Sequence, residues 1–237
     1  MNTRKVLLFL VPLMFFLALR TQAEPLPEAE IQALLNRVQQ TYSELEGFRA
    51  KFDQRLLNAS NKSEELRQGR MAYKRPALVR WENESPEPET LIVGLDTVWD
   101  YFPGEDAVYI YPVSQVLESK AIVRLLSGQA KLAEEFEIFS AEEEGGLIKL
   151  SMAPIKAEPS LVEAQVWVDP ADAIMRRILV FDFYFNENDV RLSELELSPE
   201  LPDELFQFSP PVDVDVFDNR KEGAEQPAAV EEKTLNE

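Results

Sequence analysis

Residues 91–128 decide the fold, and they read LIVGLDTVWDYFPGEDAVYIYPVSQVLESKAIVRLLSG. The first half contains three short segments that are rich in β-branched and aromatic residues and are separated by Gly and Pro: 91–93, 97–102 and 107–111. Such segments are typical of neighbouring antiparallel strands. From Ser114 the apolar residues recur at helical spacing until Gly128. The stretch therefore predicts a β-meander that is interrupted by a helical insertion.

The segment before this stretch predicts a helix over residues 28–46. Pro27 is a typical residue at a helix start, and apolar residues then recur every three or four positions. These residues are Ile31, Leu34, Leu35, Val38, Tyr42 and Leu45. We expect Gly47 to cap the C-terminus of the helix. Beyond it the apolar period changes to two, beginning with Phe48, Ala50 and Phe52, and this predicts strands.

The segment after residue 128 predicts a short second helical piece over residues 130–135, followed by further strands. The expected strands are 136–139, 147–152, 164–168, 174–185 and 190–197, with a last alternating stretch from Phe206 to Val216. An open, antiparallel barrel covered by the two helical segments would bury the apolar faces of both. The space between helices and sheet fits a packed core or an apolar ligand cavity, and periodicity does not distinguish the two.

The N-terminus has the composition of a secretory signal peptide. Arg4 and Lys5 precede an apolar run over residues 6–19, and small or tolerated residues follow up to Ala23. A membrane anchor is the alternative, but the run is shorter than the ~20 residues that span a bilayer. We therefore predict a signal peptide at 1–23, a folded domain at 24–218 and an acidic, disordered tail at 219–237.

Composition excludes several classes of function. The 237 residues include 24 Lys and Arg, 43 Asp and Glu, no His and no Cys, and the formal net charge is −19. Without His or Cys there is no His-based catalysis, thiol catalysis or His-containing zinc site. The negative charge disfavours binding to nucleic acid. A carboxylate-dependent hydrolase remains an alternative, although no acidic pair lies in a recognisable catalytic motif.

Four short motifs, in this order along the chain, carry a resemblance to a known family. They are Phe52-Asp53-Gln54, Lys74-Arg75-Pro76 with Trp81 shortly after it, Trp99-Asp100-Tyr101, and Phe206-Gln207-Phe208-Ser209-Pro210-Pro211. Together with the signal peptide and the helical insertion, they resemble the periplasmic outer-membrane lipoprotein carrier protein family, LolA. The resemblance covers roughly residues 28–217.

The resemblance implies a fold and a function. Members of this family have an unclosed barrel of about eleven strands that is covered by an N-terminal helix and a central helical insertion. The cavity between them shelters lipoprotein acyl chains as a monomeric carrier crosses the periplasm from an inner-membrane ABC transporter to the outer-membrane acceptor LolB. This implies a transport protein without enzymatic activity or cofactor. A relative that binds another lipid, a glycolipid or an envelope-stress partner is the alternative.

The resemblance also implies roles for particular residues. Arg75 matches the family's arginine that bonds backbone carbonyls of the lid, although an exposed strand-end charge beside a carboxylate is the alternative. The expected acyl-chain cavity and lid comprise Ile31, Leu34, Leu35, Val79, Trp81, Ile122, Val123, Leu125 and Leu126. Trp99 and Tyr101 fit a cavity wall and an outward packing position equally well.

Overall fold

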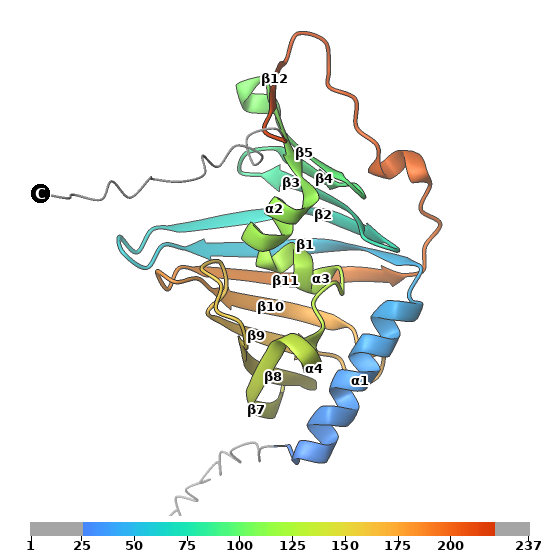
Figure 1. Ribbon diagram of the computed structural model, residues 1–237, viewed down its shortest axis with the longest axis vertical. Coiled ribbons are helices and arrows are strands. Elements are labelled where there is room, and N and C mark those ends of the chain that lie inside the picture. The colour runs from blue at the N-terminus through green and yellow to red at the C-terminus, as the bar shows by residue number, and fades with distance from the viewer. Residues whose placement is uncertain (1–25, 221–237) are drawn as a thin grey trace, which may run out of the picture.

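The computed structural model describes residues 26–220, and twelve strands of this part form one curved sheet (Figure 1). The strand order is β12-β6-β5-β4-β3-β2-β1-β11-β10-β9-β8-β7. The strands at the two ends of this order, β12 and β7, do not pair, so the barrel is unclosed. Neighbours are antiparallel except β12, which runs parallel to β6. The predicted fold class is confirmed, with twelve strands rather than about eleven.

Most strand and helix bounds lie close to the predicted ones. The strands are β1 Gly47–Leu57, β2 Glu64–Lys74, β3 Leu78–Ser85, β4 Glu89–Val93, β5 Thr97–Phe102, β6 Ala107–Pro112, β7 Phe136–Glu144, β8 Leu147–Pro154, β9 Glu163–Val168, β10 Met175–Phe181, β11 Glu187–Leu197 and β12 Asp215–Asp218. The helices are α1 Glu28–Glu44, α2 Val113–Ser119, α3 Ala121–Leu126 and α4 Leu132–Glu135, with 3₁₀ turns η1 Pro103–Glu105 and η2 Asp203–Phe206. The predicted signal peptide and residues 221–237 of the predicted tail lie outside the described residues.

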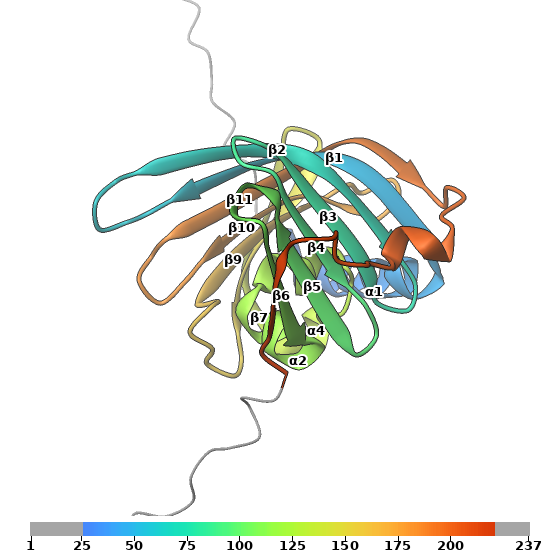
Figure 2. The same ribbon diagram turned by 90° about the horizontal axis from the view of Figure 1, so that it is seen from above.

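The sheet separates an apolar inner face from a charged outer face. In β1, Phe48, Ala50 and Phe52 are buried, whereas Arg49 and Lys51 between them are exposed. This alternation is the expected pattern of a strand with one face on a core. Seen from above, the sheet wraps around the helices (Figure 2). The core therefore lies between the concave side of the sheet and the helical insertion.

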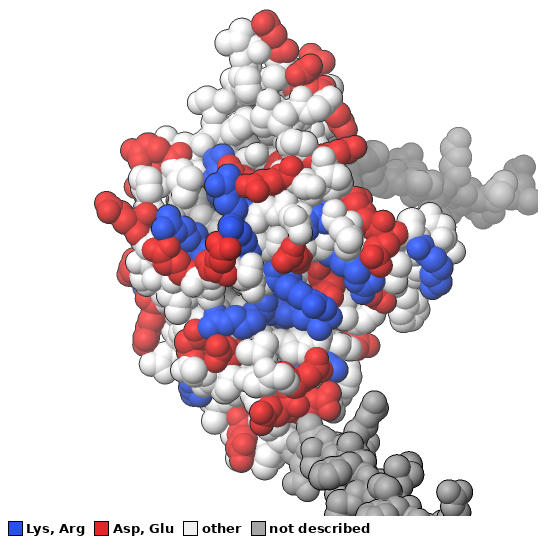
Figure 3. Space-filling model, turned by 180° about the vertical axis from the view of Figure 1, so that it is seen from behind, with Lys and Arg blue, Asp and Glu red and all other residues white. Residues whose placement is uncertain are grey.

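The outer face carries most of its cations in ion pairs. Figure 3 shows Lys and Arg grouped across the side of the sheet away from the helices, with acids around them. Arg49 pairs with Glu196 at 2.6 Å, and the two guanidinium nitrogens of Arg177 donate to the buried carboxylate of Asp189, each at 2.8 Å. An exposed pair such as Arg49–Glu196 adds little stability, typically below about 1 kcal/mol. The Lys and Arg side chains of the outer face are thus mostly paired with acids and do not form a free basic patch.

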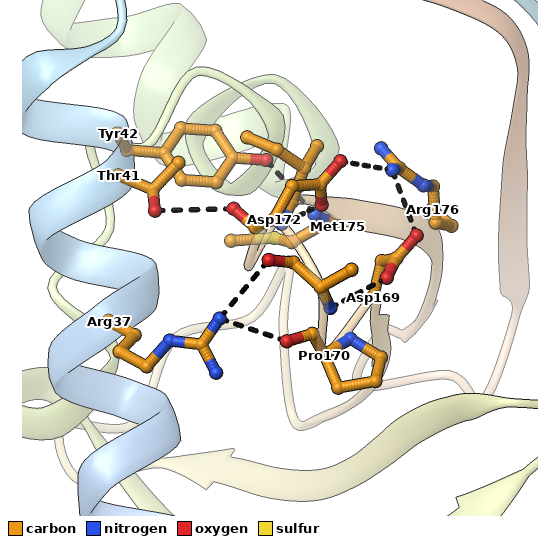
Figure 4. A network of polar contacts seen from close by, with 10 residues as sticks. Arg37, Thr41, Tyr42, Asp169, Pro170, Asp172, Met175 and Arg176 are labelled. Atoms are coloured by element: carbon orange, nitrogen blue, oxygen red, sulfur yellow. Dashed lines mark hydrogen bonds and ion pairs between the residues drawn. The ribbon is translucent and has the colours of Figure 1, made fainter.

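Helix α1 is fixed to the turn between β9 and β10 by polar contacts (Figure 4). Arg37 donates to the carbonyl of Pro170 at 2.9 Å, and the Thr41 hydroxyl donates to that of Asp172 at 3.3 Å. The hydroxyl oxygen of the buried Tyr42 accepts a hydrogen bond from the backbone N–H of Met175 at 3.3 Å, and burial raises the pKa of this tyrosine. These contacts hold α1 across one end of the sheet.

Two details of α1 differ from the prediction. The helix ends at Glu44, and the backbone of its C-cap residue, Leu45, is already extended. Gly47 is the first residue of β1 and does not cap the helix. A Cβ atom at Gly47 would lie 2.4 Å from the carbonyl oxygen of Tyr73 on β2. This glycine is therefore needed for the close approach of two strands.

Two predicted strands are shorter in the structure. The predicted strand over 174–185 ends at Phe181, because Asp182 begins a turn that leads into β11. Of the predicted alternating stretch from Phe206 to Val216, only its end belongs to a strand, β12. Phe206 lies in η2 and is buried. Two consecutive prolines follow shortly after, and proline cannot donate to a strand ladder.

Among residues 26–220, no helix is long and apolar enough to cross a bilayer. The same residues contain no group of three or more acidic side chains placed to hold a metal ion.

Candidate functional site

A cavity of about 660 Å³ lies between the concave face of the sheet and the start of α3 in the helical insertion. Its apolar lining comes from β1, β3, β4, β10 and α3. These residues are Leu56, Leu57, Trp81, Leu91, Ala121, Ile122, Val123 and Val180. The volume falls within the roughly 300–1,000 Å³ of typical ligand pockets. The sequence pattern does not distinguish a packed core from a ligand cavity, and the structure contains both.

The floor of the cavity rests on two aromatic rings that are in contact and tilted relative to each other. The rings of Trp81 on β3 and Phe52 on β1 lie 4.2 Å apart between centroids. Gly69 on the intervening strand β2 makes room for them, because a Cβ atom there would lie 2.8 Å from the Phe52 ring. It would also lie 1.9 Å from the carbonyl oxygen of Glu82. Gly69 therefore belongs to the architecture of the cavity floor although it does not line the cavity.

The mouth of the cavity is polar. Gln54 donates to the side chain of Asn188 at 2.8 Å, and the backbone N–H of Ala59 donates to the side chain of Asn186 at 2.9 Å. The charged residues of the cavity lining are Arg67, Glu89, Lys120, Asp182 and Glu187. An apolar interior behind a polar mouth suits a ligand with an apolar chain and a polar head.

A cluster of charges ties the helical insertion to the concave face of the sheet. Lys120 lies at the junction of α2 and α3, and its Nζ lies 3.3 Å from the Asp100 carboxylate on β5 and 3.7 Å from Glu89 on β4. Arg67 on β2 pairs with Glu89 at 3.0 Å. A second contact, 2.6 Å long, joins Arg124 of α3 to Glu158 of the loop between β8 and β9. These ion pairs form the polar attachment of α3.

Asp100 is the least favourably placed member of this cluster. It is 6% exposed, and its Oδ1 atom has no hydrogen-bond partner among the described residues. Burial raises the pKa of Asp100 to about 6; the Lys120 ammonium opposes this shift, and the nearby Glu89 carboxylate adds to it. The charged carboxylate is thus poorly solvated where it lies beneath the helical insertion.

We expect Asp100→Asn to change the pH dependence of stability. Because the pKa of Asp100 is about 6 in the folded state and 3.8 ordinarily, the folded state binds this proton more tightly. The free energy of unfolding therefore falls as pH rises between these values. Asparagine does not titrate, so the variant lacks this fall in the free energy of unfolding. The stability advantage of the variant should grow by about 2 kcal/mol from pH 4.5 to pH 7.5.

Urea unfolding of both proteins at the two pH values measures this difference, and the comparison cancels the titration of groups remote from Asp100. An advantage that stays constant with pH would contradict the burial of a charged Asp100. Asp53→Asn is a matched control, because Asp53 lies on the exposed face of β1.

Comparison with known proteins places this fold in a family. The family model described as "Outer membrane lipoprotein carrier protein LolA" matches residues 43–209. The chain belongs to the LolA family. Outer-membrane lipoprotein carrier proteins from Dechloromonas aromatica and Legionella pneumophila are each 26% identical to it. The first match covers 71% of this chain and 79% of the relative, and the second covers 88% and 97%.

A solved structure shows the same fold at lower identity. An uncharacterized conserved protein from Thermus thermophilus superposes with a TM-score of 0.52 at 14% identity. The superposition covers 80% of this chain and 99% of the other. This likeness concerns the LolA fold alone.

Three of the nine predicted cavity and lid residues line the cavity: Trp81, Ile122 and Val123. The other six are buried in the core instead. They are Ile31, Leu34, Leu35, Val79, Leu125 and Leu126. In this structure the buried side of α3 fills the concave face of the LolA fold, so the cavity is confined to one end. A role for any of the nine in binding an acyl chain stays a prediction.

Arg75 contacts α1 and not the central helices. Its guanidinium donates to the carbonyl of Ser43 at 3.1 Å and pairs with the Glu46 carboxylate. Its side chain is 43% exposed. Arg75 thus bonds a carbonyl of α1 and an exposed acid. Whether this contact acts as a lid latch stays a prediction.

Trp99 and Tyr101 pack on the outer side of the sheet. Both rings lie against Phe208, at centroid distances of 5.8 and 5.5 Å. They fix the segment that runs from η2 to β12, and neither lines the cavity.

The charge cluster at Lys120 was not found from the sequence. Its signal was present in the Trp99-Asp100-Tyr101 motif, where an acid takes the inward position of a strand. Leu91 on β4, which lies opposite Asp100 in the strand register, is buried in the cavity wall. An inward carboxylate requires a partner, and Lys120 supplies it from the helical insertion.

Proposed function

We propose that this chain is a periplasmic carrier that shields the acyl chains of lipoproteins and delivers them from the inner membrane to the outer membrane. The observation that carries the proposal is the apolar cavity with a polar mouth beneath the helical insertion. Membership of the LolA family supports it, as do relatives named outer-membrane lipoprotein carrier protein. The activity is binding and release, with no chemical step.

The energetics of the task fit this architecture. A myristoyl-length chain has about a dozen methylenes, and each is worth roughly 0.8 kcal/mol when buried. A chain exposed to water thus costs on the order of 10 kcal/mol, so a carrier must enclose it. The carrier must also release it. An insertion that makes its own contacts in the empty protein competes with cargo and weakens the net grip.

The helical insertion is suited to this competition. Its apolar side chains occupy the concave face in the closed form, and the ion pairs of Lys120 and Arg124 hold it there. When cargo displaces α3, its acyl chain contacts the apolar face of the sheet, and the protein loses these ion pairs. We propose that an inner-membrane lipoprotein-releasing transporter loads the chain and that an outer-membrane acceptor of the LolB type, or a substitute, receives the cargo.

A photoreactive lipopeptide tests where the acyl chain binds. A triacylated lipopeptide that carries a diazirine in one acyl chain should label α3 and β3, at Ile122, Val123 and Trp81. Labelling should fall at least tenfold with an excess of unlabelled lipopeptide. Labelling confined to the convex face, or labelling that does not compete, would contradict the proposal. A glycolipid or another lipid that competes better than the lipopeptide would favour the alternative cargo.

A further inference from the structure

Three consecutive aromatic residues project from the turn between β10 and β11. Phe183, Tyr184 and Phe185 are 66%, 76% and 69% exposed, and we call them the aromatic tip. The rings of Phe183 and Tyr184 meet edge to face at 5.6 Å. A contiguous group of exposed aromatic side chains on a soluble fold marks a site of interaction.

The backbone of the aromatic tip is held in place by hydrogen bonds. The Asp182 carboxylate accepts from the backbone N–H of Tyr184 at 2.8 Å and of Asn186 at 2.9 Å. The N–H of Phe183 donates to the carbonyl of Pro159 at 3.0 Å, and that of Phe185 donates to the carbonyl of Asp182 at 2.9 Å. The turn thus presents the three rings to solvent in a fixed arrangement.

The aromatic tip lies at the mouth of the cavity. Tyr184 belongs to the cavity lining, together with its neighbours Asp182 and Asn186. Asn186 also binds Ala59 of the adjacent hairpin. Figures 1 and 2 both show the β1–β2 and β10–β11 hairpins extending to the same side of the sheet. A surface that contacts the aromatic tip therefore also faces the entrance of the cavity.

We propose that the aromatic tip is a membrane-contact site that inserts into the interface of a phospholipid bilayer. Aromatic side chains favour the headgroup level of a bilayer. The tip is a small convex projection. Three aromatic side chains offer on the order of 500 Å² in total, whereas a specific protein partner takes up roughly 800 Å² of each surface.

The charge of the protein determines the kind of bilayer. The aromatic tip carries no charged side chain, and the whole chain has a net charge of −19. Anionic headgroups therefore repel the protein and add nothing to insertion. The contact should be a transient one with zwitterionic lipid, driven by burial of the rings and insensitive to salt.

Flotation with phosphatidylcholine vesicles tests this inference without any lipoprotein. The chain from Glu24 onward should float with the vesicles, and Phe183→Ser/Tyr184→Ser/Phe185→Ser should reduce the bound fraction at least tenfold. Phe139→Ser is the matched control, because Phe139 is 57% exposed on the edge strand β7 and does not line the cavity. It should float like the unchanged chain.

Three results would overturn the inference: no flotation of the unchanged chain, equal flotation of the triple variant, or flotation that needs anionic lipid and is lost in high salt. Self-association through the tip, seen as a concentration-dependent dimer that the triple variant lacks, would also overturn it. Lipopeptide binding in the absence of vesicles reports the carrier function separately. That binding should persist in Phe183→Ser/Phe185→Ser, which leaves the cavity-lining Tyr184 in place.

Discussion

We expect a covalent tether between α3 and the sheet to abolish lipopeptide uptake. The chain contains no cysteine, so Glu89→Cys and Lys120→Cys can be joined selectively by a short bismaleimide. Both residues line the cavity, and Lys120 Nζ is 3.7 Å from the Glu89 carboxylate. The affinity for a fluorescent triacylated lipopeptide should fall at least tenfold in the tethered protein.

The physical reason is that α3 occupies the space that cargo needs. Ile122, Val123, Leu125 and Leu126 are all buried in the common core, so most of the concave face is inaccessible while α3 stays in place. The same double variant reacted with N-ethylmaleimide is the matched control, because it carries the same substitutions without the tether. It should bind the lipopeptide at least as tightly as the unchanged chain, because it lacks the ion pairs of Lys120 that hold α3 in place. Equal binding by the tethered protein would contradict the requirement for displacement of α3.

A single methyl group at Gly69 should be among the most destabilising substitutions in the chain. The new Cβ atom would lie 1.9 Å from the carbonyl oxygen of Glu82, which is backbone of the paired strand β3 and cannot rotate away. It would also meet the Phe52 ring beneath Trp81. Strands β2 and β3 must separate to accept it. We expect Gly69→Ala to lower the free energy of unfolding by more than about 3 kcal/mol.

Urea unfolding measures this loss, and Gly104→Ala is the matched control. A Cβ atom at Gly104 would meet nothing within 4 Å, so that variant should stay within about 0.5 kcal/mol of the parent. If Gly69→Ala folds at all, its cavity floor should be displaced and lipopeptide binding should weaken. Equal stability of the two variants would show that β2 and β3 do not approach each other as closely as described.

Local pattern predicts the elements of this fold well, because most strands bury alternate residues and α1 buries a single stripe. The pattern fails where an aromatic run has no neighbouring strand to pair with. Residues 182–185 continue the β-like composition of β10, yet the Asp182 carboxylate binds the backbone N–H groups beyond it and turns the chain. Composition alone does not reveal that competition between side chain and strand pairing.

The site was predicted only in part, for a related reason. The apolar residues of the insertion were expected to face the sheet, and they do, but periodicity does not show which of them leave a void. Trp81, Ile122 and Val123 border the cavity, whereas Leu125 and Leu126, on the same short helix α3 as Ile122 and Val123, are packed in the core. The partners of Arg75 and Asp100 come from elements remote in the sequence. Only the assembled sheet brings Lys120 to Asp100.

The most direct test of the carrier proposal is the release of a labelled lipoprotein from inner-membrane vesicles that contain its releasing transporter. The purified chain from Glu24 onward, added with ATP, should bring the lipoprotein into the soluble fraction as a one-to-one complex. The chain tethered between positions 89 and 120 should fail to do so. A folded, untethered chain that leaves all of the lipoprotein on the vesicles would contradict the account.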